Sequence, residues 1–184
     1  MVAGESYPIW LSEPEDLEFF WEMLHEAAHH PPLSDPAISR YLKGWGRPGD
    51  NTTVEAFDPD DGRRIVAACY SLMPAEESGY GSVNVSTPEV VTAVVPDRRC
   101  LGVGRALLRR LLETAALQRF NALSLGVRRN NPAVVELYER SGFVKLFDID
   151  SECPSRAMKA DLTAHENGRG LPLTEASATN GPRD

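Results

Sequence analysis

The sequence predicts an α/β fold with a mixed sheet, and three observations support this fold class. The first is the nearly unbroken apolar run over residues 89–95, which is typical of a central strand covered on both faces. The second is the pattern over residues 104–119, where leucines recur at helical spacing. The third is a further apolar strand over residues 122–127. A strand, a helix and a strand in this order imply that the two strands run parallel.

The N-terminal part is predicted to contain two helices. Residues 12–15 form a capping box, which marks a helix start. Apolar side chains then recur at helical spacing from Leu17 to Ala28, and the His-His-Pro-Pro run over residues 29–32 ends this helix. A second, short helix is expected over residues 35–45, because its apolar side chains also share one face.

The other predicted elements are, in chain order, strands over residues 52–57 and 64–73, a helix over residues 132–141, and strands over residues 143–147 and 156–162. A turn over residues 58–62 separates the first two strands. Gly142 follows the helix directly, as is common at helix ends. We therefore expect one domain over residues 1–162. Residues 163–184 are polar and rich in Gly, Pro and Thr, so we expect a disordered tail.

Composition and length narrow the class of protein. The 184 residues are 42% hydrophobic and 25% charged, which suits one globular domain. No apolar run is long enough for a membrane helix, and residues 1–11 do not resemble a secretory signal, so we expect a cytoplasmic protein without a membrane partner. The cysteines match neither a disulfide framework nor a zinc pattern, so no metal is expected. They are Cys69, Cys100 and Cys153.

The charge is unevenly distributed along the chain. Residues 1–62 hold thirteen acids and three bases, a net charge of −10, whereas residues 63–184 hold fourteen acids and sixteen bases, a net charge of +2. The overall charge of −8 argues against nucleic acid as the main partner. The split suggests an anion site in the second part and a cationic ligand near the first. The alternative is that the acids only keep the surface soluble.

The segment from Val94 to Leu108 carries the strongest functional signal. A buried strand ends in a short loop that leads directly into a helix, and the loop contains Gly102 and Gly104. Glycines let the backbone approach a ligand closely, and the N–H groups at a helix start favour an anion. Five arginines lie between positions 98 and 110. This pattern predicts a pyrophosphate site, although the P-loop and dinucleotide fingerprints are both absent. The alternative is a tight strand–helix turn with solvated arginines.

Two motifs resemble the GNAT superfamily of N-acetyltransferases. Arg99-x-x-Gly102-x-Gly104, after a Val-Val-Pro strand end, is similar to motif A of that family. Asn130-x-x-Ala133-x-x-x-Tyr138-x-x-x-Gly142-Phe143 is similar to its later motif. The resemblance covers about residues 89–147. It implies a mostly antiparallel central sheet with helices on both faces and a parallel strand pair at the CoA site.

The resemblance implies an N-acetyltransferase that moves the acetyl group of acetyl-CoA to an amine by direct attack. The residues that it implies for CoA binding are Val94, Val95, Arg99, Cys100, Leu101, Gly102, Val103, Gly104, Arg105 and Asn130. Two positions depart from the family, which often has Gly at position 100 and a basic residue at position 101. If residue 100 needs a positive φ, Cys100 is strained. The lost base at Leu101 can be compensated by Arg98, Arg105 or Arg109.

The same resemblance implies two catalytic residues. Tyr138 matches the tyrosine that protonates the departing CoA thiolate, and its alternative is a packed aromatic ring. Glu89 lies where relatives often carry a general base, but a slip of one residue would send its side chain to the other face. Its alternative is a solvated acid at a strand end. His29 and His30 are weaker candidates for the base. Asn131 competes with Asn130 as the cap of the following helix.

The acceptor amine is not specified by the sequence, and a small molecule and a peptide both stay open. Relatives build the acceptor side from the first two helices, where this chain is acidic, with Glu22, Glu26 and Asp35 near the expected rim. We therefore expect a cationic amine. The competing function is a non-catalytic acyl-CoA-binding sensor or structural module, and a homodimer is left open.

Overall fold

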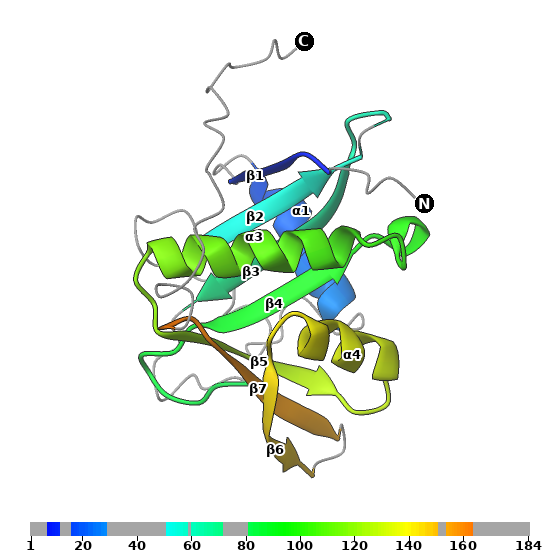
Figure 1. Ribbon diagram of the computed structural model, residues 1–184. Helices are drawn as coiled ribbons and strands as arrows, with labels where there is room; N and C mark the ends of the chain where they lie inside the picture. Colours follow the sequence, from blue (N-terminus) through cyan, green and yellow to red (C-terminus); the bar gives the residue numbers. More distant parts are fainter. Residues whose placement is uncertain are drawn as a thin grey trace.

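The computed structural model describes residues 7–11, 16–28, 51–58, 60–71, 81–150 and 154–163. Its centre is a seven-stranded sheet with the strand order β1-β2-β3-β4-β5-β7-β6 (Figure 1). The strands are β1 (Ile9–Leu11), β2 (Asn51–Phe57), β3 (Arg64–Ser71), β4 (Glu89–Val94), β5 (Ala122–Arg128), β6 (Val144–Ile149) and β7 (Ser155–Asp161). All neighbouring strands pair antiparallel except β4 and β5, which run parallel. The predicted mixed, mostly antiparallel sheet is confirmed.

Helices cover both faces of this sheet. The helical elements are α1 (Leu17–Ala27), a short 3-10 helix η3 (Pro96–Arg98), α3 (Val103–Leu117) and α4 (Pro132–Arg140). The buried leucines of α3 and the ring of Tyr138 on α4 share one core cluster with Val90. The buried face of α1 shares a second cluster with Val91 and Ala93. Because neighbouring residues of a strand face opposite ways, β4 is buried from both sides, as its apolar run predicts.

The predicted elements agree with the structure to within a few residues wherever both can be compared. Helix α1 begins at Leu17, with Asp16 as its N-cap residue. The capping box at residues 12–15, the histidines at 29–30 and the second helix over residues 35–45 lie outside the described residues. Of the predicted tail, only Thr163 lies inside them.

Among the described residues, strand β6 pairs with β7 alone, so it lies at the edge of the described sheet. The register with β7 shifts between Lys145 and Phe147, so β6 carries a bulge. Three apolar side chains of β6 are exposed, and they belong to Val144, Leu146 and Phe147. In the described part of the chain, no helix has both the length and the apolar character needed to cross a membrane.

Candidate active site

The parallel strands β4 and β5 separate toward their C-terminal ends. They share one register pair, Glu89 with Ser124, at the start of β4, whereas β3 and β4 pair from Glu89 to Val94. Figure 1 shows the two strands diverging from this point, and we call the opening between them the splay. Among the described residues, β4 and β5 make no further ladder pair, so their facing backbone groups, apart from the Val94 carbonyl that bonds Arg99, are left for an extended ligand with amide groups.

The chain leaves β4 through a loop that is shaped to present backbone N–H groups. Gly102 is the N-cap residue of α3 and has a φ of 86°. Its carbonyl accepts the N–H groups of Arg105 and Ala106 at 3.1 and 3.2 Å. The N–H groups of Val103 and Gly104 precede these and have no intrahelical carbonyl to bond, because they belong to the first turn. This helix start therefore favours an anion.

The two glycines of the loop have different surroundings. A Cβ at Gly104 would lie 3.5 Å from Leu137 Cδ2 and 3.6 Å from Val94 Cγ2. These are ordinary van der Waals distances, so the packing of the start of α3 on β4 and α4 does not by itself require a glycine at position 104. A Cβ at Gly102 would meet nothing within 4 Å, so its outer side is open, and its φ is what favours glycine there.

Cys100 adopts the strained conformation that its departure from the family predicts. Its φ is 63°, in the left-handed region that costs a residue with a side chain about 1 kcal/mol. Its side chain is exposed and forms no disulfide. The next residue, Leu101, is also exposed, and its carbonyl accepts the hydroxyl of Tyr7 at 3.1 Å. Residues 100–102 therefore form an outward-facing turn.

Two of the predicted anion-binding arginines hold the protein itself together. Arg98 pairs with Asp58 at 2.6 Å, and the Asp58 side chain is only 3% exposed. Arg99 donates from Nε to the carbonyl of Val94 at 2.9 Å and from Nη2 to Glu26 at 2.7 Å. The positive charge of these two side chains is thereby partly neutralised.

The other three arginines of the segment lie on α3. Arg109 and Arg110 both lie near Glu113, at 3.9 and 4.0 Å. Arg105 is exposed in the first turn, and within the described ranges it makes no ion pair. Of the five arginines, Arg105 is the one whose charge is not compensated by an observed carboxylate.

Tyr138 is buried and faces β4 from α4. Its side chain is 7% exposed, and its ring packs edge-on against Phe143 at a centroid distance of 5.7 Å. Burial raises the pKa of the Tyr138 hydroxyl to about 12, and the side chain of Thr92 on β4 opposes this rise. The phenol is therefore protonated at neutral pH and can act as a proton donor.

Glu89 is not a solvated acid at a strand end, so that alternative is wrong. It is 2% exposed, and its Oε1 accepts the N–H of Gly81 at 2.7 Å. By strand alternation with Val91 and Ala93, its side chain lies on the α1 face of the sheet. A Cβ at Gly81 would come within 2.1 Å of the β5 backbone at Leu125, so only glycine fits beside the narrow end of the splay.

The two candidate asparagines are separated by the structure. Asn131 is the N-cap residue of α4, and its Oδ1 accepts the N–H of Val134 at 3.3 Å. Asn130 lies exposed in the preceding turn. The capping role thus belongs to Asn131, which leaves the side chain of Asn130 turned to the solvent beside the end of β5.

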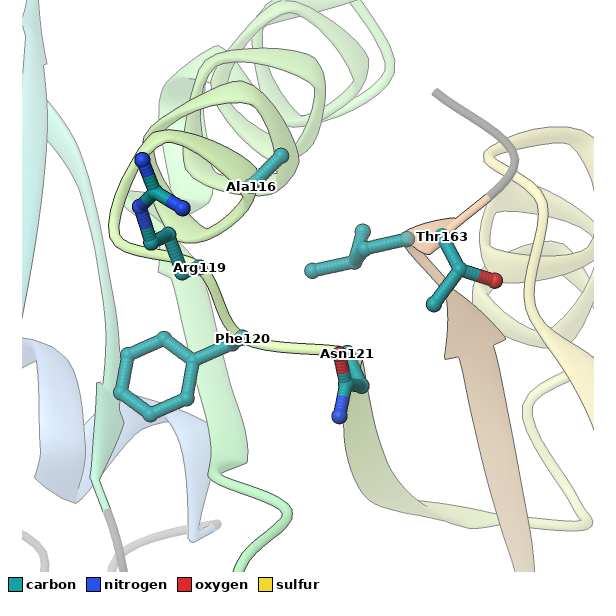
Figure 2. Close-up of a pocket in the computed structure, with 6 residues that line it drawn as sticks. Ala116, Arg119, Phe120, Asn121 and Thr163 are labelled. Atoms are coloured by element: carbon teal, nitrogen blue, oxygen red, sulfur yellow. The ribbon is translucent and has the colours of Figure 1, made fainter. Parts of the chain in front are cut away.

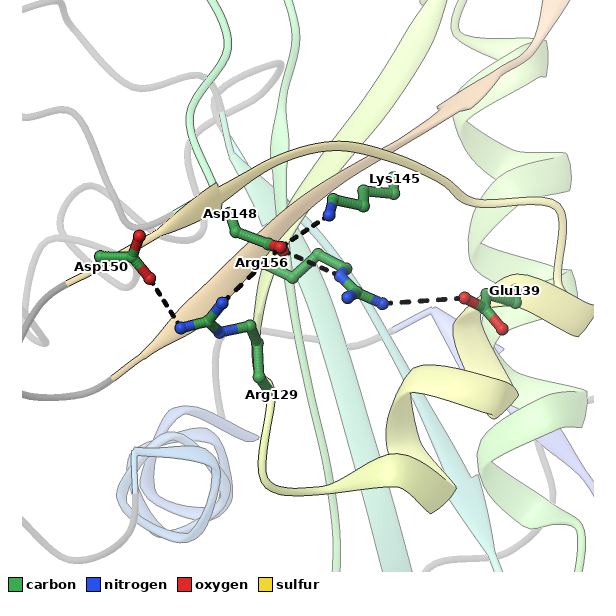
Figure 3. Close-up of polar contacts among 6 residues, drawn as sticks. All are labelled: Arg129, Glu139, Lys145, Asp148, Asp150 and Arg156. Carbon is green, nitrogen blue, oxygen red and sulfur yellow. Dashed lines mark hydrogen bonds and ion pairs between the residues drawn. The ribbon is translucent and has the colours of Figure 1, made fainter.

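A charged network that the sequence analysis missed holds the end of β5 (Figure 3). Arg129 pairs with Asp150 at 2.7 Å and lies 3.6 Å from Asp148. Asp148 also pairs with Lys145 at 2.6 Å and with Arg156 at 3.1 Å, and these two cations lower its pKa. No sequence pattern joins these residues, because the hairpin of β6 and β7 brings them together.

Of the three acids expected at the rim of the acceptor site, one is paired with an arginine and one lies outside the described residues. Glu26 is used by Arg99, as described above, and Asp35 lies outside the described residues. Glu22 is exposed on α1. The excess of acids in residues 1–62 is partly explained by ion pairs with residues 63–184. Asp16 pairs with Arg64, and Asp58 pairs with Arg98.

A separate small pocket lies at the other end of α3 (Figure 2). It has a volume of about 200 Å³, and its lining residues are Ala116, Arg119, Phe120, Asn121, Leu162 and Thr163. The loop between β4 and α3 precedes the first turn of α3, whereas this pocket adjoins its last turn. Within the described residues, no three side chains of the types that bind metals gather into a cluster.

Comparison with known proteins identifies the family of this chain. The family model described as Acetyltransferase (GNAT) family matches residues 10–143. No curated protein sequence matches the chain significantly.

Solved structures share the fold. A spermidine N-acetyltransferase SpeG chimera from Vibrio cholerae and hSSAT has a TM-score of 0.65 at 18% identity, over 88% of this chain and 99% of that chain. The ribosomal-protein-S18-alanine N-acetyltransferase from Escherichia coli has a TM-score of 0.65 at 21% identity, over 85% and 94%. AAC(6′)-Ib in complex with paromomycin and acetyl-CoA has a TM-score of 0.62 at 19% identity, over 90% and 99%.

Proposed function

This chain belongs to the GNAT acetyltransferase family and is an N-acetyltransferase, and from that premise we propose that it moves the acetyl group of acetyl-CoA to a cationic amine by direct attack. The observation that carries the proposal is the splay between β4 and β5, which opens beside the free N–H groups at the start of α3. An extended arm with amides and a pyrophosphate need these two features side by side.

The binding of acetyl-CoA is supported by groups with no other use in the fold. The N–H groups of Val103 and Gly104 point from the helix start, and the exposed Arg105 adds a full positive charge. The pantetheine amides would pair with the β4 edge near Val94 and Val95. The Val94 carbonyl already accepts Arg99, so the N–H groups remain the available partners on that edge.

In the proposed chemistry, the amine nitrogen forms a bond to the thioester carbon, the C–S bond breaks, and Tyr138 protonates the departing sulfur. A phenol with a pKa of about 12 keeps its proton until the thiolate develops, which suits a general acid. The attacking nitrogen loses a proton as the amide forms, and water carries that proton back to Tyr138. The low exposure of Tyr138 excludes bulk solvent from competing for this position.

The amine must lose a proton to become a nucleophile, because an alkylammonium has a pKa of about 10. We assign this step to Glu89, acting through water. Glu89 lies about 17 Å from Val94 along β4, so it lies at the narrow end of the splay and away from the helix start. The Glu89 carboxylate is buried against Gly81 and cannot itself reach an amine at the open end of the splay, so the proposed proton transfer needs a water relay.

The cationic acceptor rests on charge and on the structural neighbours. Glu22 and its acidic surroundings remain on α1 after the pairing of Glu26, and an acidic surface attracts cations. The neighbours are named for spermidine and for a ribosomal-protein alanine, and one is bound to paromomycin. These are all amines, and at neutral pH they are cationic.

The test is thiol release from acetyl-CoA with matched amines. The panel contains spermidine, paromomycin, a peptide with an N-terminal alanine, and glutamate as an anionic control. We expect turnover that favours the cations and falls as salt rises. A preference for glutamate, or equal rates, would remove the cationic acceptor. Binding of acetyl-CoA by calorimetry without turnover of any amine would favour the sensor function instead.

A further inference from the structure

The loop between β4 and α3 is tied to earlier parts of the chain by three consecutive side chains. Asp97 pairs with Arg63 at 2.7 Å, and the pairs of Arg98 and Arg99 were described above. The Arg63–Asp97 pair is the most exposed of the three, so it is worth little. The loop thus depends mainly on its second and third anchors.

The third anchor differs from the others because it comes from a helix on the opposite face of the sheet from α3. Glu26 lies in the last turn of α1, and its side chain is 20% exposed. Its carboxylate accepts a hydrogen bond from Nη2 of Arg99. The Nε of the same guanidinium donates to the last carbonyl of β4, at Val94. One planar side chain therefore fixes the strand end, the loop and α1 in a single geometry.

This anchor directly precedes the strained part of the loop. Cys100 has a φ of 63°, and Gly102 has a φ of 86° two residues later. A side chain in the left-handed region keeps that conformation only where its surroundings determine it. Without the carboxylate of Glu26, the guanidinium of Arg99 has one fewer fixed partner. The turn that presents the α3 N–H groups is then held less firmly in its strained conformation.

We propose that Glu26 is a positioning residue for acetyl-CoA binding, and that it acts through Arg99 without touching the cofactor. The inference rests on the proposed use of the α3 start as the pyrophosphate site. It gives α1 a role on the cofactor side of the reaction, besides the acceptor side where the sequence analysis expected it.

The experiment compares Glu26→Gln with Glu18→Gln, an exposed glutamate of the same helix that serves as the matched control. Calorimetry measures the Kd for acetyl-CoA, and steady-state kinetics measure KM and kcat. We expect Glu26→Gln to raise the Kd and the KM for acetyl-CoA about threefold to tenfold, because the amide still accepts a hydrogen bond from Arg99 and loses only its charge assistance, with a change in kcat of less than about twofold. Glu18→Gln should bind as the wild type does.

The double mutant tests whether the effect passes through Arg99. If it does, Glu26→Gln combined with Arg99→Gln binds acetyl-CoA no more weakly than Arg99→Gln alone, because coupled residues are not additive. Additive losses, or an unchanged Kd in Glu26→Gln, would overturn the inference. A wild-type protein that does not bind acetyl-CoA would overturn the proposed function, and this inference with it.

Discussion

The two sides of the splay are held by arginines in different ways. On the β4 side, Arg99 reaches Glu26, which is 73 positions away in the sequence. On the β5 side, Arg129 reaches Asp150, which is 21 positions away, within the hairpin that follows. The β4 side is therefore complete only when the N-terminal helix has docked, whereas the β5 side is assembled from one continuous stretch. On the β4 side, Arg98 and Arg99 therefore serve mainly to hold the loop to other parts of the chain.

The two sides also differ in what they offer a substrate. The β4 side ends in Gly102 and the first turn of α3, which present N–H groups and Arg105. The β5 side leads into α4 and the buried hydroxyl of Tyr138. We expect changes on the β4 side to alter acetyl-CoA binding, and changes on the β5 side to alter the chemical step.

The largest expected effect is on the β5 side. Tyr138→Phe should lower kcat about 100-fold or more, because it removes the proposed proton donor for the thiolate, while Kd for acetyl-CoA changes little. Burial against Phe143 suits the phenylalanine ring, so the fold should persist. Because the pKa of Tyr138 is about 12, the wild-type kcat should show no loss from its ionisation below about pH 11. Wild-type turnover by the variant would return Tyr138 to packing.

The next effect is on the β4 side. Arg105→Gln should raise the Kd for acetyl-CoA about tenfold, since it removes the uncompensated cation at the helix start. Arg109→Gln is the matched control, because that arginine is exposed one turn later and already lies near Glu113. Calorimetry at low salt measures both variants. Equal affinities for the two would show that Arg105 does not reach the phosphates.

A third comparison concerns stability. Arg98→Gln leaves the buried carboxylate of Asp58 without its cation and should cost about 2 kcal/mol of unfolding free energy. Arg129→Gln should cost less, because its partner Asp150 is exposed and Asp148 keeps Lys145 and Arg156. Urea unfolding of the two variants decides the order. A larger loss for Arg129→Gln would reverse the comparison.

The β5 network should also respond to acid. Lys145 and Arg156 lower the pKa of Asp148, so its ionised form stabilises the folded state above its ordinary pKa of about 4. This contribution is lost as the pH falls through the lowered pKa. The stability difference between wild type and Asp148→Asn should therefore be constant from pH 7 to pH 5 and shrink in stronger acid. Thermal melts from pH 7 to pH 3 measure it, and a difference that persists at the lowest pH would contradict the assignment.

The smallest expected effect is at Cys100. Cys100→Gly relieves the positive φ but adds freedom to the unfolded chain, so the net gain in unfolding free energy should be below about 1 kcal/mol. Cys100→Val should instead destabilise, because a β-branched residue tolerates this region poorly. Denaturation midpoints of the two variants lie on either side of the wild type if the strain is real. Two variants with the same midpoint would argue against it.

Local patterns located the helices and strands around the candidate site better than the contacts between them. The apolar run of β4, the glycines of the loop and the leucines of α3 each follow from neighbouring residues, so their elements could be located from the sequence. Whether position 100 needs a positive φ was left as a condition by the sequence, and the structure supplies the answer, with a φ of 63° at Cys100. The choice between Asn130 and Asn131 could not be made, because both precede Pro132 and both can cap.

The long-range contacts could not be predicted in this way. That Glu26 meets Arg99 depends on where α1 docks on the sheet, and no local spacing encodes this. The register of Glu89 was equally open, since one residue's slip changes its face. The acids of the N-terminal half suggested a cationic ligand, but part of that charge serves to hold the arginines of the other half.

The bulged edge strand β6 has a consequence for how this protein behaves at high concentration. Its exposed Val144, Leu146 and Phe147 would let a second chain extend the sheet and begin an aggregate. The bulge between Lys145 and Phe147 twists this edge away from a flat template, and Lys145 places a cation among the apolar side chains. A charged side chain between exposed apolar residues of an edge strand disfavours pairing with a second chain, so a neutral residue at position 145 should make this edge more prone to aggregation.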